Sequence, residues 1–147
     1  MPRIERSAEV VWEGNVARGS GTLTADTGAF SGLPFTLASR VASPEGKTSP
    51  EELLAAAHAG CFTMSLASEL VRAGTPPGTL DVRVKIVMDE VEGQGHQIVG
   101  SEVSVRAELE GVDGAALDAA IADADEGCPF SALLRRAGAN VTISSDT

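Results

Sequence analysis

The stretch Ser49–Gly74, SPEELLAAAHAGCFTMSLASELVRAG, decides the fold. Ser49 is a favourable N-cap, Pro50 suits the first helical position, and the glutamate at position 52 completes a capping box. Gly74, which two prolines closely follow, ends the helix. The span between is apolar on nearly every side, which is typical of a helix that is buried all round. At a rise of about 1.5 Å per residue, this helix is about 36 Å long, as long as a small domain is wide.

Strands are expected on both sides of the long helix. Alternating apolar residues bounded by turn residues predict strands at 5–12, 20–25 and 35–39 before it, and at 80–91, 97–110 and 140–144 after it. Ile98 is out of phase with the other apolar residues of its strand, which predicts a β-bulge near Gly100. Two more helices are predicted, one after Asp113 and a short one that begins at Cys128-Pro129.

The order of these elements lacks a regular βαβ alternation. The sequence therefore predicts an α+β fold, in which antiparallel sheets wrap a long central buried helix. With 147 residues, the chain is expected to form one domain, residues 1–147, large enough to bury a core.

Composition narrows the functional classes. The net charge of −10 argues against binding to nucleic acid or to an anionic membrane surface. The first ten residues, MPRIERSAEV, carry charges where a signal peptide needs an apolar run. Charged residues in the long helix argue against a membrane span. We expect a cytoplasmic protein, in which both cysteines are reduced, bind a metal or take part in redox chemistry.

Cys61 lies in the middle of the long helix. A cysteine on a buried helix is usually a small hydrophobic residue, and burial raises the pKa of a thiol. A reactive Cys61 therefore needs a cation close to it.

Cys128 stands just before Pro129 at the expected start of a helix. The free N–H groups and the dipole there favour a thiolate, although a cysteine can also serve as a poor N-cap. By position alone, Cys128 is expected to have the lower pKa of the two cysteines.

His58 precedes Cys61 by three residues and so shares its helix face. It is interpreted as a core or interface histidine, as the partner of a Cys–His nucleophile, or as a zinc ligand with both cysteines. The lone helix pair is weak support for zinc, because close-spaced further ligands are missing. We expect no metal and no cofactor.

Glu51 lies in the first helical turn, where an acid stabilises the helix dipole. It precedes Cys61 by ten residues, about 15 Å along one helix. It can influence the thiol only through a long arginine or from a second chain. Arg40 and Arg18 are the candidate arginines, and either can also be an ordinary surface charge.

Three segments together resemble the OsmC/Ohr family of osmotically inducible and organic hydroperoxide resistance proteins. They are Ser49-Pro50-Glu51-Glu52-Leu53, Ala57-His58-Ala59-Gly60-Cys61-Phe62 and Gly127-Cys128-Pro129, and the match extends to Val11-Trp12-Glu13-Gly14 and Arg18-Gly19-Ser20-Gly21-Thr22. The Glu-Glu-Leu form and the Trp12-Glu13-Gly14 start are more similar to the OsmC branch. Ser49 replaces the family's asparagine, and Gly60 replaces an alanine.

The resemblance implies a thiol peroxidase and an intertwined homodimer with two active sites at its interface. It assigns Cys61 as the cysteine that attacks peroxide, Cys128 as the resolving cysteine and Glu51 as the residue that orients an arginine over the thiol. In the OsmC branch that arginine corresponds to Arg40; in the Ohr branch it lies near the N-terminus, which makes Arg18 the second choice.

The implied reaction reduces an organic hydroperoxide through a Cys61 sulfenic acid and a Cys61–Cys128 disulfide, in defence against peroxide and osmotic stress. An external dithiol, such as one on a lipoyl protein, then reduces the disulfide. Apolar neighbours such as Phe62, Met64 and Phe130 are expected to favour organic hydroperoxides. The alternative is a protein of the same fold that binds a small apolar ligand, or a stress protein, without catalysis.

Overall fold

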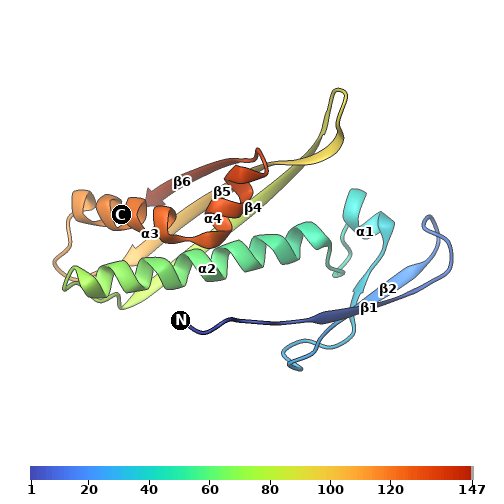
Figure 1. The fold of residues 1–147 in the computed structure, drawn as a ribbon, viewed down its shortest axis with the longest axis horizontal. Coiled ribbons are helices and arrows are strands. Elements are labelled where there is room, and N and C mark those ends of the chain that lie inside the picture. The colour runs from blue at the N-terminus through green and yellow to red at the C-terminus, as the bar shows by residue number, and fades with distance from the viewer. Residues whose placement is uncertain (147) are drawn as a thin grey trace. The chain divides into compact units, whose positions relative to one another are not determined.

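The structure is a computed structural model that describes residues 1–146. Its contacts divide the chain into two compact units, unit 1 (Met1–Leu53) and unit 2 (Leu54–Thr147). The long helix α2 (Pro50–Arg72) begins in unit 1 and continues into unit 2 (Figure 1). A single domain over the whole chain stays a prediction.

Unit 1 contains a three-stranded antiparallel sheet in the order β1 (Ala8–Glu13), β2 (Ser20–Ala25) and β3 (Leu33–Phe35). The rings of Trp12 and Phe35 pack with their centroids 5.5 Å apart. Gly21 lies beneath them, and a Cβ at this position would be 2.5 Å from a ring carbon of Phe35. The position therefore requires glycine, because any side chain would displace the aromatic pair.

The predicted strand at 35–39 is wrong. The strand ends at Phe35, and a short helix, α1 (Leu37–Val41), follows it. Thr36 caps this helix by accepting a hydrogen bond from the Ser39 amide, and the Ser39 hydroxyl accepts one from the Thr36 amide. These reciprocal bonds satisfy the free amides of a helix start and so end the strand. Arg40 therefore lies in the last turn of α1.

The predicted start of α2 is confirmed, but only half of its capping box forms. Ser49 Oγ accepts a hydrogen bond of 3.2 Å from the Glu52 amide. The Glu52 carboxylate instead accepts a hydrogen bond of 2.9 Å from the Thr48 hydroxyl. A neighbouring hydroxyl therefore takes the place of the backbone amide that the capping box predicts.

Unit 2 contains a second sheet in the order β4 (Thr79–Val91), β5 (Gly95–Glu108) and β6 (Asn140–Asp146). Strands β4 and β5 form an antiparallel hairpin, whereas β5 and β6 are parallel. The parallel pairing arises because α3 (Gly114–Gly127) and α4 (Pro129–Arg136) cross over between these two strands. The α+β class is confirmed, with antiparallel pairing throughout except between β5 and β6.

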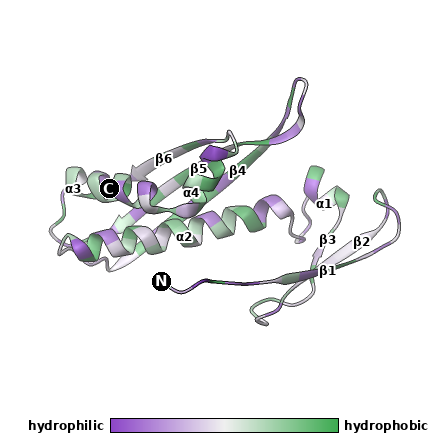
Figure 2. Cartoon of the chain, viewed as in Figure 1, coloured by the Kyte–Doolittle hydropathy of each residue, from purple (hydrophilic) through white to green (hydrophobic). Residues whose placement is uncertain are grey.

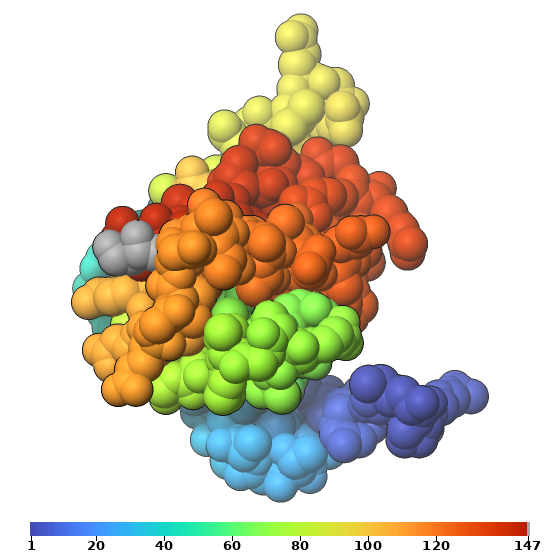
Figure 3. Space-filling model, turned by 90° about the vertical axis from the view of Figure 1, so that its left-hand side faces the viewer, coloured from blue at the N-terminus to red at the C-terminus, as the bar shows by residue number. Residues whose placement is uncertain are grey.

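The predicted bulge is also confirmed. Val87 pairs with Gly100, but Met88 pairs with Ile98, so that Val99 is the extra residue. The shift turns Ile98 toward the same apolar cluster that Leu134 enters from α4. The hairpin continues past the bulge, and its far end stands away from the rest of unit 2 (Figure 3).

Helix α2 is the central helix that the sequence predicts. Its residues Phe62, Leu66 and Leu70 are at most 1% exposed and pack with Val103 and Val105 of β5. The core is completed from α3 by Leu117, Ala120, Ile121 and Ala124. Within one chain, however, burial is confined to one face of α2.

Two large apolar residues of α2 lie outside that buried face. Met64 is 71% exposed and Val71 60%. Figure 2 shows hydrophilic residues at both ends of α2. The helix is long and apolar enough to cross a membrane by length and composition alone, yet its buried face packs into the core of unit 2, as in a core helix.

Candidate active site: a thiol pair and an ion pair

Cys61 and Cys128 meet within unit 2. Cys61 is partly exposed on α2, Cys128 is buried, and both are free thiols. The Cys128 side chain is hydrogen-bonded to the sulfur of Cys61, and the backbone N–H of Phe130 donates a second hydrogen bond to the Cys61 sulfur. The fold thus brings the two cysteines of the sequence into direct contact.

The surroundings of Cys61 raise the pKa of its thiol. Burial is the largest cause, and the hydrogen bond and the charge interaction with Cys128 act in the same direction. The Phe130 N–H lowers the pKa, because it stabilises the thiolate, but it does not outweigh the other causes. The expectation that a buried Cys61 needs a cation therefore applies to the folded chain.

Cys128 lies at the junction of two helices. It is the C-cap of α3 and the N-cap of α4, and its side chain makes no capping hydrogen bond. Pro129 occupies the first position of α4, so the Phe130 amide is the first N–H of the helix. That amide has no partner within the helix, which leaves it free to bond Cys61.

His58 is fully buried and hydrogen-bonds two serines. Its Nδ1 lies 2.7 Å from Ser101 Oγ on β5, and its Nε2 lies 2.8 Å from Ser131 Oγ on α4. All three residues, here called the histidine–serine cluster, are 0% exposed. Burial lowers the pKa of His58; the charge of Asp125 opposes this effect and that of Arg135 adds to it.

The cluster answers the question that the sequence left open about His58. Both ring nitrogens are engaged by serines, so the imidazole is a core histidine with its hydrogen bonds satisfied. Among residues 1–146, no three side chains of the His, Cys, Asp and Glu types gather as a metal site would require.

Arg40 and Glu51 form an ion pair in unit 1. Arg40 Nε and Nη2 donate to the same carboxylate oxygen, Glu51 Oε1, at 2.8 and 2.6 Å. This hydrogen bond raises the pKa of Arg40 above its ordinary value. Partial burial alone would raise the pKa of Glu51, but the hydrogen bonds and charge that it receives outweigh burial and lower it. The pair is therefore charged at neutral pH.

The second-choice arginine has different surroundings. Arg18 is exposed in the turn between β1 and β2, where its amide donates to Asn15 Oδ1 at 2.9 Å. The structure thus pairs Arg40, and not Arg18, with the glutamate that the family resemblance singles out.

Arg40 also lines a small hollow in unit 1. The hollow has a volume of about 110 Å³, and its other walls are mostly apolar, from Trp12, Val16, Phe35, Leu37 and Pro50. A guanidinium at the edge of an apolar hollow suits a ligand with one polar and one apolar end. The sequence did not predict this hollow, because its walls come from separate elements.

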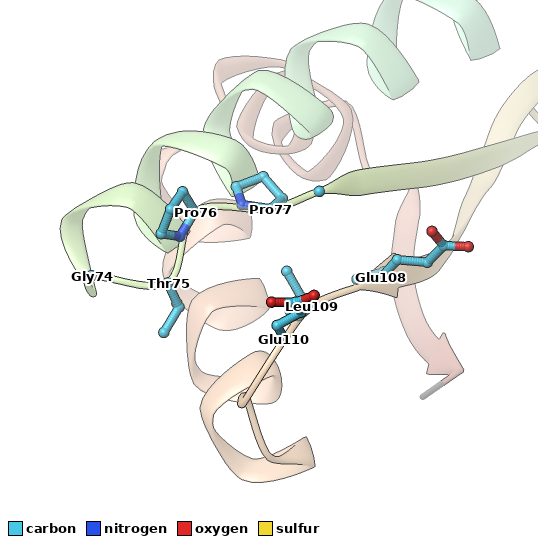
Figure 4. Close-up of a pocket in the computed structure, with 9 residues that line it drawn as sticks. Gly74, Thr75, Pro76, Pro77, Glu108, Leu109 and Glu110 are labelled. Carbon is cyan, nitrogen blue, oxygen red and sulfur yellow. The ribbon is translucent and has the colours of Figure 1, made fainter.

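A larger surface hollow, about 790 Å³, lies in unit 2 and includes none of the four predicted site residues. Pro76 and Pro77 form one wall, and Leu109 and Glu110 face them (Figure 4).

Of the apolar residues expected beside the thiol, Phe62 is 0% exposed in the core and is therefore closed to a substrate.

Sequence reasoning missed Ser101, Ser131 and the Phe130 amide. Ser101 occupies the inward-facing row of β5 that continues with Val103 and Val105. A serine in such a row is a signal for a buried polar partner, which here is His58. The Phe130 amide leaves no signal in the side-chain sequence beyond Pro129, which marks the helix start.

Comparison with known proteins agrees with this fold. The OsmC-like protein family matches residues 43–144, and the chain belongs to this family. It is 33% identical over 132 residues to peroxiredoxin OsmC of Escherichia coli strain K12, a match that covers 90% of this chain and 91% of the relative. The same values hold for peroxiredoxin OsmC of Shigella flexneri.

Solved structures share the fold. The organic hydroperoxide resistance protein OhrB of Bacillus subtilis has a TM-score of 0.75 at 23% identity, covering 95% of this chain and 98% of that one. An OsmC-like protein of unknown function from Vibrio cholerae has a TM-score of 0.79 at 16% identity, covering 98% and 100%. The predicted family is therefore confirmed, and the family includes named peroxidases.

Proposed function

We propose that this chain is a cysteine-based peroxidase that reduces organic hydroperoxides to alcohols. The observation that carries the proposal is the hydrogen-bonded contact between the free thiols of Cys61 and Cys128. Such a pair can pass between dithiol and disulfide without a large movement of the chain. The relatives named peroxiredoxin OsmC support the same reaction class.

In the proposed reaction, the Cys61 thiolate attacks the outer oxygen of the hydroperoxide. The O–O bond breaks, the alkoxide leaves and takes up a proton to become the alcohol, and Cys61 becomes a sulfenic acid. The Cys128 sulfur then attacks the Cys61 sulfur, water leaves, and a disulfide forms. An external dithiol, such as one on a lipoyl protein, restores both thiols by exchange.

The thiolate needs a positive charge, because burial raises the pKa of Cys61 in the reduced chain. We assign this role to Arg40, with Glu51 as the residue that positions its guanidinium. The two short hydrogen bonds to one carboxylate oxygen support the assignment, because they restrict the guanidinium to a defined orientation. The guanidinium would also stabilise the charge that develops on the leaving alkoxide.

The test uses one equivalent of an organic hydroperoxide and the intact mass of the protein. The proposal expects the loss of two hydrogen atoms per chain as the disulfide forms, and no such loss in Cys61→Ser. Cys128→Ser should instead gain one oxygen at Cys61. Unchanged mass in the native chain, together with unchanged peroxide, would refute the proposal.

We further propose that the protein is a cytoplasmic homodimer with a role in peroxide and osmotic stress. The exposed Met64 and Val71 on α2 support a dimer, because a second copy would remove these apolar side chains from water. Sedimentation velocity should show a dimer in the native chain and a weaker one in Met64→Glu. A native monomer at micromolar concentration would contradict the dimer.

A further inference from the structure

The histidine–serine cluster (His58, Ser101 and Ser131) joins three elements at one point. His58 comes from α2, Ser101 from β5 and Ser131 from α4. Each of these residues begins an otherwise apolar buried row: His58 precedes Phe62 on α2, Ser101 precedes Val103 on β5, and Ser131 precedes Leu134 on α4. The three rows therefore meet at their polar ends.

The hydrogen bonds of the cluster fix one arrangement of these elements. A neutral imidazole has one donor and one acceptor nitrogen, so one serine accepts a hydrogen bond and the other donates one. With every member 0% exposed, no water can replace a lost partner. A slip of α4 along α2 would leave buried polar groups unpaired, which is costly.

The first turn of α4, which carries Ser131, also carries the groups that contact Cys61. Ser131 follows Cys128 by three residues and Phe130 by one. The second turn of α4 has its own apolar anchor, since Leu134 is buried in a cluster with Ala139 and Val141. The buried polar anchor of the first turn is the hydrogen bond from Ser131 to His58.

We propose that the His58–Ser131 hydrogen bond is a positioning device that holds the first turn of α4 in place, so that Cys128 stays against Cys61 for disulfide formation. This inference deepens the proposed function and rests on it, because it names what keeps the two thiols in reach of each other. Ser101 holds the other side of the imidazole and serves the core alone.

The two serines provide a matched pair of variants. Ser131→Ala and Ser101→Ala each remove one hydroxyl from the same histidine, and each leaves one ring nitrogen unpaired in the core. Both should lower the melting temperature by similar amounts. Only Ser131→Ala frees the first turn of α4 in the reduced chain, so that forming the disulfide must order this turn again.

The measurement is the redox equilibrium of the full chain with dithiothreitol. The two thiols give two electrons and two protons to oxidised dithiothreitol, whose ring disulfide opens to a dithiol, and acid trapping with intact mass gives the ratio. We expect Ser131→Ala to lower the equilibrium constant for the protein disulfide about three- to tenfold, the scale of one hydrogen bond. Ser101→Ala should change it by less than about twofold.

Replacement of His58 gives a second, independent pair. The amide nitrogen of a glutamine reaches the place of Nε2 and that of an asparagine the place of Nδ1, so His58→Gln can keep the Ser131 bond and His58→Asn cannot. His58→Gln should retain more of the native equilibrium constant than His58→Asn.

Equal changes in the two serine variants, no change in Ser131→Ala, or no disulfide in the native chain would each overturn the inference. No peroxide enters the measurement. A chain that fails to consume peroxide can therefore still show the predicted difference, and an active peroxidase can fail to show it.

Discussion

The buried histidine makes the stability of this protein depend on pH in a way that can be calculated. Burial holds the pKa of His58 below its ordinary value of 6.5. The unfolded chain therefore takes up a proton at this residue before the folded chain does. The neutral His58 imidazole therefore makes its full contribution to the free energy of unfolding above pH 6.5. This contribution is lost as the pH falls below that value.

The size of the effect follows from proton linkage. If the folded chain stays neutral at His58, the free energy of unfolding falls by up to about 1.4 kcal/mol one pH unit below the ordinary value, and by up to about 2 kcal/mol 1.5 units below it. Glu51 acts in a different window, because its lowered pKa affects stability only near and below its ordinary value of 4.5. The two contributions are therefore separable.

Urea unfolding at a series of pH values tests this calculation. The free energy of unfolding is compared between the native chain and His58→Gln. The difference between the two values should grow smaller as the pH falls from neutral, because the variant lacks the titrating group. His96→Gln is the matched control, because it makes the same replacement at a side chain that is 72% exposed and lies 3.2 Å from Glu90. Parallel curves for the native chain and His58→Gln between neutral pH and the lower window would refute the reasoning.

Three further outcomes are expected. Gly21→Ala should destabilise unit 1 by about 1–3 kcal/mol in urea unfolding. Gly60→Ala should instead stabilise α2 by about 1 kcal/mol, because the added Cβ would meet no atom within 4 Å. Equal effects of the two substitutions on the free energy of unfolding would contradict the packing argument. Phe62→Ala should cost about 3–5 kcal/mol of unfolding free energy, and the exposed Met64→Ala should cost far less in the monomer. Glu51→Gln should slow peroxide consumption about tenfold or more with a stability change below about 1 kcal/mol, and an unchanged rate would remove Glu51 from the mechanism.

Local patterns in the chain were enough to predict most of the elements. The Ser49 cap, the out-of-phase Ile98 and the Asp113 cap each act over a few residues, and the structure confirms them. The strand predicted at 35–39 failed for a local reason too: the reciprocal hydrogen bonds of Thr36 and Ser39 start a helix, and alternation of apolar residues does not register them.

The sequence predicted which residues form the candidate site, but not the contacts between them. Cys61, Cys128, Arg40 and Glu51 were predicted by number, because reactive side chains and a family resemblance are visible in the chain. The ion pair of Arg40 with Glu51 and the contact between the cysteines were not derivable from spacing, since each joins residues on different elements. The catalytic roles of these four residues stay predictions.

The sequence by itself determined that a long apolar helix with Cys61 at its middle forms the core of an α+β protein. The reason is that capping and apolar periodicity depend on neighbours within a few residues along the chain. The tertiary structure alone decided what surrounds the thiol. Burial raises the pKa of Cys61, and the amide of Phe130 and the thiol of Cys128 at the start of α4 hydrogen-bond to its sulfur. A buried histidine on α2 with two serine partners connects the start of α4 to α2. Such contacts depend on how distant segments pack, and packing is a property of the whole fold.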